Sequence, residues 1–501
     1  MIWHIFKKDL RLQWKFVALM ALVQFANLTL LIKISPFLEN ATLRNLFQLL
    51  FMATLVGIPF LVAAGVHLDP IPGVRQDWLV RPIRRVDLLL AKSLFVIAAV
   101  HVPMLLADLI RGLAFGFPFG ASLEAALSHG LFVLLVVSLP LLAFASLTKN
   151  TMEAITAALV VFLAVAAFSL IFQPHGNASL LPTTGLAWVQ EAAHSLLLIV
   201  VAGVVLFLQY FRRRTLLSRG VTVAAVVVAM FSMYLPWNQA FAIQQRLSSD
   251  PSAAASVNVA FDPAAERFHR SPDMYGDEER AVVAVPLRFA NMPDGSVLIS
   301  DRVEISRGDT GELDGRIGSV LARRRTGDDR PLSYLIANLS ADLYQRIKDE
   351  SQPVHLKLYL TLFRPAGSST VPAINGRLHT PDLGDCATKM NSAETAIRLG
   401  CVPLAERPSC FGVQLRVPNG PANPEQFQCQ GDYAPFFDAV LITPAGSQNI
   451  PFRDVNGLAK YPVDGTLLNQ AQLAIHTFEA VDHFTRTVEI PGIRLRDWTM
   501  Q

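Results

Sequence analysis

The chain has 501 residues, of which 52% are hydrophobic, and this is more than one ordinary globular core accommodates. Residues 1–236 hold 17 Lys and Arg against 9 Asp and Glu, a formal charge of +8, whereas residues 237–501 hold 26 against 31, a formal charge of −5. This balance excludes a basic tail and gives no indication of a nucleic-acid partner.

Apolar runs of bilayer-spanning length follow one another in the first part of the chain, and none occurs after Pro236. A run of about 18 or more apolar residues is typical of a membrane-spanning helix. We therefore predict a polytopic α-helical membrane bundle over 16–236, with about seven spans at 16–32, 46–66, 94–113, 131–147, 155–172, 196–211 and 221–235.

Positive charge predicts the orientation of the spans, because short cytoplasmic loops are enriched in Lys and Arg. With the N-terminus inside, the inside segments, Lys92 included, hold fourteen Lys and Arg, and the outside loops hold only Lys33, Arg44 and Arg111. Seven crossings then place the C-terminal region outside the cytoplasm. We expect a multi-pass protein of a bacterial inner (plasma) membrane.

The longest inside segment, residues 67–92, holds five of these fourteen cations. Pro70, Pro72 and Gly73 interrupt the second span, and the stretch around Trp78 suits a short interfacial helix. Its arginines would face lipid headgroups or the acidic surface of a cytoplasmic partner. The simpler alternative is a loop that only sets the orientation.

Ionisable residues inside a bilayer are costly and point to function. The membrane polar residues of this kind are His101, Asp108, Arg111, Glu191 and His194. They either line a substrate path or pair locally near the interface and reach outward, and we favour the second interpretation. Gln24 and Asn27 are interpreted as helix-packing positions.

From about residue 252 the pattern changes to short alternating or β-branched runs such as SVLISDRVEIS and PVHLKLYLTLF, separated by turn residues. This pattern predicts an extracytoplasmic all-β, sandwich-like region over 252–501. Its length suits one large sandwich or two, and we favour two, split near 367–373.

All four cysteines, Cys386, Cys401, Cys410 and Cys429, lie in this region. An even number in an extracytoplasmic domain predicts two disulfides, with three possible pairings. Four buried free thiols are the alternative. A zinc site is less favoured because no CxxC pair occurs, and we predict no metal site.

No catalytic motif was found: the chain lacks HExxH, GxSxG and the GxxxxGK[ST] phosphate loop. We therefore predict no enzyme activity and no cofactor bound by this chain.

Three stretches, IFKKDLRLQW, WLVRPIRRVDLLLAK and SLTKNTMEAI, together resemble the membrane subunits (permeases) of ABC-2 type transporters. The resemblance covers roughly residues 1–215. A seventh span and a large outer domain depart from the family, whose usual subunit has six spans.

The resemblance implies that residues 1–15 form an amphipathic elbow helix along the inner leaflet. It also implies a coupling helix over 74–86, which would bind a separate ATP-binding subunit through Arg75, Trp78, Arg81, Arg84 and Arg85. ATP would then be bound by that partner, and the permease would work as a homodimer or heterodimer in contact with membrane lipid.

The sequence thus favours the permease of an ATP-driven exporter. The alternative is a non-transporting membrane-anchored protein whose β-rich outer domain binds a ligand or protein partner.

Overall fold

The structure is a computed structural model of the whole chain. It describes all residues except 34–40, 71–83, 173–186, 233–236, 267–279, 308–311, 314–320, 325–329, 341–343, 346–347, 350–352, 381–382, 391–395, 403–409, 419–424, 430–445, 452–464, 492–494 and 499–501.

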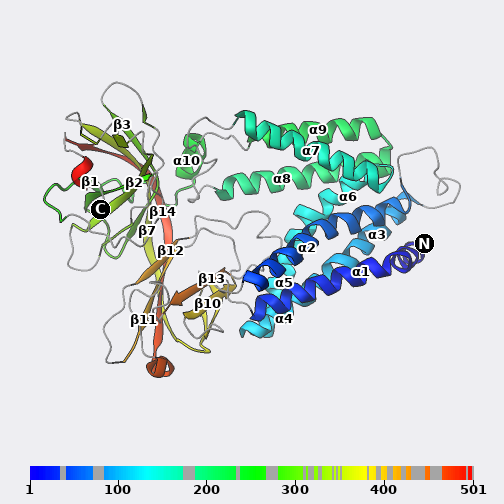
Figure 1. Ribbon diagram of the computed structural model, residues 1–501, viewed down its shortest axis with the longest axis horizontal. Coiled ribbons are helices and arrows are strands. Elements are labelled where there is room, and N and C mark those ends of the chain that lie inside the picture. Colours follow the sequence, from blue (N-terminus) through cyan, green and yellow to red (C-terminus); the bar gives the residue numbers. More distant parts are fainter. Residues whose placement is uncertain are drawn as a thin grey trace.

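The N-terminal part is a bundle of helical rods, and the C-terminal part is rich in β-strands (Figure 1). Within the described residues, the seven rods are α1 (Ile2–Lys33), α2 (Ala41–His67), α3–η2–α4 (Arg85–Val96, Ile97–His101, Val102–Phe115), α5–η3–α6 (Phe119–Val133, Leu134–Ser138, Leu139–Ser146), α7 (Thr151–Phe172), α8–η4 (Ala187–Leu206, Phe207–Arg212) and α9 (Thr215–Ser232). Each predicted span overlaps one rod, but the rods begin 4 to 14 residues earlier than the predicted spans.

Five of the described rods are long and apolar enough to cross a membrane, over Asn45–His67, Arg85–Phe115, Phe119–Ser146, Thr151–Phe168 and Ala192–Arg212. Helix α9 contributes a shorter apolar stretch, Thr215–Met230. Large apolar side chains on the bundle surface are exposed, such as Leu159 and Phe162 of α7. An exposed apolar surface of this extent is typical of helices surrounded by lipid.

Helix α1 differs from the elbow expected over residues 1–15, because it runs without a break from Ile2 to Lys33. Ile5, Phe6 and Asp9 face the bundle and are buried, whereas Trp3 and Trp14 on the other side are exposed. The buried contacts at its start explain why this segment continues the rod.

The third and fourth rods are joined by a three-residue turn and not by the long outside loop expected between residues 113 and 131. Gly116 ends α4 in the left-handed conformation at φ 110°, which glycine adopts without strain. The turn therefore reverses the chain within a few residues, and α5 brings His129 into the bundle.

Two π-helical turns, η2 and η3, interrupt these two rods, and each ends two residues before a proline, Pro103 or Pro140. A proline ring within a helix clashes with the carbonyl group four residues earlier, which lies inside the π-turn in both cases. The wider turn relieves that clash, so the prolines account for both interruptions.

The β-rich part contains three antiparallel sheets. The three-stranded sheet has the order β1 (Asn258–Phe261), β2 (Arg280–Ala290), β6 (Leu332–Ser340). The four-stranded sheet has the order β13 (Gly446–Pro451), β10 (Ala396–Val402), β9 (Gly384–Met390), β8 (Arg377–Thr380). The seven-stranded sheet has the order β12 (Gln426–Cys429), β11 (Cys410–Arg416), β14 (Gln472–Ile490), β7 (Val354–Pro372), β3 (Val297–Arg307), β4 (Glu312–Leu313), with β5 (Leu321–Arg323) also paired to β3.

Strands β7 and β14 have 19 residues each and pair along their whole length. Leu356, Leu358, Leu360 and Leu362 alternate along β7 and are at most 1% exposed, as expected for one buried face of a strand. They share a core with the three-stranded sheet, whereas the far halves of β7 and β14 share a second core with the four-stranded sheet.

No linker divides the region at 367–373, since β7 continues to Pro372. The two cores are instead joined by the β7–β14 pair, which runs through both (Figure 1).

Helix α10 (Trp237–Arg246), which follows the last rod, and the end of α4 both contact the β-rich part. The short helix α10 packs Phe241 edge-on against Tyr359 of β7, with ring centroids 5.1 Å apart. At the turn after α4, Lys389 Nζ donates to the Ala114 carbonyl at 2.9 Å. Gly400 is needed there, because a Cβ would lie 2.6 Å from the ring of Phe115.

Candidate functional site

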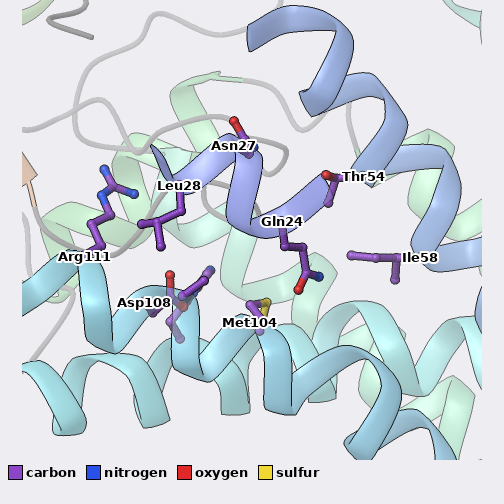
Figure 2. Close-up of a pocket in the computed structure, with 10 residues that line it drawn as sticks. Gln24, Asn27, Leu28, Thr54, Ile58, Met104, Asp108 and Arg111 are labelled. Atoms are coloured by element: carbon purple, nitrogen blue, oxygen red, sulfur yellow. Dashed lines mark hydrogen bonds and ion pairs between the residues drawn. The ribbon is translucent and has the colours of Figure 1, made fainter. Parts of the chain in front are cut away.

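A cavity lined by both polar and apolar side chains lies between α1, α2, α4 and α5 (Figure 2). Its lining residues are Gln24, Asn27, Leu28, Thr54, Ile58, Met104, Ala107, Asp108, Arg111 and His129. The cavity volume is ≈ 50 Å³, enough for a few water molecules or the charged end of a larger molecule but not for a large substrate.

Helical spacing explains why these residues meet. Gln24, Asn27 and Leu28 lie three and four residues apart, which places them on one face of α1. On α4, Arg111 follows Asp108 by three residues and Ala107 by four, so it lies on the same face of the helix as both. Gln24 and Leu28 of α1 point toward α4, and the Arg111 side chain reaches from α4 toward α1 (Figure 2).

The cavity contains a tightly bonded acid and base. His129 Nδ1 lies 2.7 Å from Asp108 Oδ2, and both side chains are largely buried. Arg111 lies near Asp108 and interacts with it electrostatically. A cation, a carboxylate and an imidazole therefore occupy one small space inside the apolar rods.

Two side-chain oxygens of the cavity, Gln24 Oε1 and Asn27 Oδ1, are buried and have no hydrogen-bond partner among the described residues. A buried polar atom left unpaired destabilises the fold by about 1–3 kcal/mol. Such atoms are expected where water or a ligand completes the bonding. The packing role expected for both residues stays a prediction.

The two π-turns meet beside the cavity. His101 ends η2 and Ser138 ends η3, and His101 Nε2 lies 3.0 Å from Ser138 Oγ. π-Turns are frequent at functional sites. His101 thus bonds across to the fourth rod and does not line the cavity with Asp108 and Arg111.

A second set of buried charges lies at the opposite end of the bundle, where α1, α2 and α3 meet. The ammonium group of Lys92 is 1% exposed and lies 2.7 Å from Asp9 Oδ2, 2.8 Å from Asp69 Oδ2 and 2.8 Å from the Gly65 carbonyl. Lys8 Nζ also bonds Asp69, at 2.9 Å. Lys92, counted among the inside cations from the sequence, is therefore a buried ion-pair partner.

Next to this network, the SLTKNTMEAI stretch forms the turn between α6 and α7. Asn150 Oδ1 accepts a hydrogen bond from the Glu153 amide at 2.8 Å, an N-capping contact. Glu153 Oε1 pairs with Arg219 of α9 at 2.9 Å, and His67 of α2 lies 2.8 Å from Thr148 Oγ1. The turn thus holds three rods together at this end.

The residues expected to couple to an ATPase are described only in part. Arg75, Trp78 and Arg81 lie outside the described residues. Arg84 is exposed at the start of α3, and Arg85 Nη1 donates to the Phe211 carbonyl at 2.8 Å. The coupling helix itself stays a prediction.

The side chain of Glu191 lies outside the described residues, and His194 is partly buried on α8 without lining the cavity. Of the five membrane polar residues, the structure brings together Asp108 and Arg111. His129 was missed because it fell in the expected outside loop. The buried positions Ser122, Ala126 and His129 follow helical spacing, a signal that could have identified it.

Cys386 and Cys401 form a disulfide between neighbouring strands β9 and β10. Cys410 is also disulfide-bonded and stands opposite Cys429 in the pairing of β11 with β12. Among the described residues there is no free cysteine, and no group of His, Cys, Asp and Glu is arranged to hold a metal ion.

Comparison with known proteins gave no match, whether to a family model, to a curated protein or to a solved structure.

Proposed function

We propose that the chain is the membrane-spanning permease subunit of an ATP-driven exporter of the ABC-2 type. Its ATPase is a separate subunit, and two permease chains work together. The N-terminus and the start of α3 face the cytoplasm, and the β-rich region lies outside.

The observation that carries this proposal is the cavity with its charged lining residues. A bundle that only anchors an outer domain has no need of Asp108, Arg111 and His129 inside apolar rods, where ionisable groups are costly. A bundle that moves a polar molecule needs such groups on its path. The cavity therefore favours transport over anchoring.

The charge network around Lys92 supports the same proposal. It ties α1, α2 and α3 at the cytoplasmic end, opposite to the end where the cavity lies near the β-rich part. A path that is polar at its outer end and closed by ion pairs at its inner end is expected of a transporter held shut toward the cytoplasm. In this proposal, force from the ATPase reaches α3, which carries Lys92.

The alternative, a membrane-anchored binding protein, draws support from the contact between the β-rich part and the bundle. Lys389 and Gly400 hold the four-stranded sheet against the turn after α4. This contact is compatible with both functions: it could fix a binding domain to its membrane anchor, or it could place the outer domain of a permease beside the cavity.

Co-purification of ATP hydrolysis separates the two functions. The full chain, tagged and extracted in mild detergent, should carry with it an ATP-hydrolysing subunit. Arg84→Glu should reduce this association, because Arg84 is exposed at the start of α3 and like charges at an interface are disfavoured. Arg85 is less suitable because its side chain also bonds Phe211.

Arg214→Glu is the matched control, since it makes the same charge change at an exposed arginine of another inside segment. The permease proposal requires loss with Arg84→Glu and retention with Arg214→Glu. If the wild-type chain carries no ATP hydrolysis, the anchored binding protein becomes the better account.

A further inference from the structure

The guanidinium group of Arg111 lacks a bonded partner within the described part of the chain. It lies four residues before the end of α4 and lines the cavity. Its neighbouring carboxylate, Asp108, directs one oxygen to His129 at 2.7 Å. Figure 2 shows the Arg111 side chain reaching beyond Asp108 on the same helix. A guanidinium with its donors unused matches a carboxylate or a phosphate, which it binds through two parallel hydrogen bonds.

The amide side chains across the cavity add the groups that would complete such a site. Asn27 is 7% exposed, and its Oδ1 and the Oε1 of Gln24 have no partner among the described residues. Each amide also offers two N–H donors, and its orientation can exchange donor and acceptor. A bound cation is disfavoured, because it would share this small space with Arg111.

The β-rich domain brings a second positive charge to the same place. The Arg398 guanidinium lies 5.2 Å over the ring of Phe115, which follows Arg111 by one helical turn. Arg398 and Arg111 are close enough to repel each other electrostatically. Lys389 lies on the neighbouring strand and bonds the Ala114 carbonyl. Glu124 of α5 is exposed and does not line the cavity, so Asp108 is the one carboxylate among its lining residues.

We propose that the cavity binds an anionic group, a carboxylate or phosphate, held by Arg111 together with Asn27 and Gln24, with Arg398 of the β-rich domain adding positive potential. This inference deepens the proposed function by naming the substrate class of the cavity. The outer domain then contributes directly to the site and is more than an attachment.

The size of the cavity bears on how the anion arrives. A volume of ≈ 50 Å³ admits a small soluble anion or the charged end of an amphiphile whose remainder lies outside. The same bonding chemistry serves both sources. Binding measurements with two kinds of probe distinguish them.

The purified full chain is tested without any ATPase, so the result does not depend on the proposed coupling. One probe is inorganic phosphate, measured by calorimetry in neutral detergent. The other is phosphatidylglycerol, measured by native mass spectrometry after exchange from nanodiscs of phosphatidylcholine with and without phosphatidylglycerol. Arg111→Gln should weaken binding of the effective probe by about tenfold or more, since it removes hydrogen bonds to a charged group.

Three further variants make the test specific. Arg111→Lys should restore part of the affinity, because it restores the charge without the planar fork. Asn27→Asp keeps the shape of the side chain and should abolish binding by adding a negative charge. Arg214→Gln, an exposed arginine at the opposite end, should bind as the wild type does.

Binding of phosphate alone would identify a soluble anion, and binding of phosphatidylglycerol alone would identify an amphiphile; either outcome supports the inference. Failure of both probes to bind the wild type would overturn it. Equal affinity of wild type and both Arg111→Gln and Asn27→Asp would overturn it as well. Anion binding with no ATPase association would instead reject only the transporter coupling.

Discussion

Replacing Lys92 by methionine removes the ammonium group that joins three rods. Lys92 is 1% exposed, and its ammonium group lies within 2.8 Å of Asp9 Oδ2, Asp69 Oδ2 and the Gly65 carbonyl. Methionine fills a similar volume, so the main effect is electrostatic: Asp9, which is fully buried, loses its main counter-ion. Removing one member of a buried ion pair destabilises a fold by about 3–5 kcal/mol.

Lys8→Met is the matched control within the same network. The Lys8 side chain is 38% exposed, so its bond to Asp69 resembles a surface ion pair and contributes only about 0–1 kcal/mol. The assay is the midpoint of thermal unfolding of the purified chain in one detergent. The double variant Asp9→Asn with Lys92→Met should recover part of the loss, because no uncompensated carboxylate remains at position 9. The reasoning is refuted if Lys92→Met costs no more stability than Lys8→Met.

Two further predictions concern the β-rich domain. Burial raises the pKa of Asp301 to about 7 and lowers the pKa of His483 to about 4. Between pH 4 and 6.5, the raised pKa of Asp301 makes stability fall as pH rises, whereas the lowered pKa of His483 makes stability rise. Asp301→Asn removes the first effect, so the thermal midpoint of this variant should increase over this pH range. A flat or falling midpoint would contradict the assignment. Replacing both Cys386 and Cys401 by serine should destabilise the domain by about 3 kcal/mol, since the bond closes a 15-residue separation; an unchanged midpoint under oxidising conditions would exclude that contribution.

The hydrogen bonds around His483 explain why its neutral form is favoured. Its Nδ1 lies 2.8 Å from Thr361 Oγ1, and Thr361 in turn donates to Asp301. Its Nε2 lies 3.3 Å from the side-chain nitrogen of Gln244 on α10. The neutral ring with its proton on Nδ1 satisfies both contacts, so the chain of bonds from α10 to Asp301 favours an uncharged imidazole.

The positions of the rods could be predicted from the sequence, because the length of an apolar run is enough to indicate a helix that crosses a membrane. The pairing of charges could not. Lys92 was counted among the inside cations, and only the rotation and packing of α1 and α3 show that it meets Asp9 in the interior. The cavity could not be predicted from the sequence for the same reason, since it depends on which faces of α1 and α4 meet.

The β-rich region shows a different limit of prediction from the sequence. Alternating runs predicted strands, but a division between two sandwiches was expected near residues 367–373. Strand β7 continues to Pro372 because β14 pairs with it along this stretch, with a register shift between Thr477 and Phe478 opposite its start. A β-bulge absorbs such an irregularity, so the pairing continues past it. Whether the two cores form one or two sandwiches stays a prediction.

Both the cavity proposal and the ATPase proposal need the N-terminus and the β-rich domain on opposite sides of the membrane. The measurement is a pair of fusions after Gln501, one to a reporter active only in the cytoplasm and one to a reporter active only outside it. We predict activity of the outside reporter alone, since the seven spans predicted from the sequence start inside and end outside. Activity of the cytoplasmic reporter at Gln501 would place the β-rich domain and its disulfide inside the cell and contradict the account.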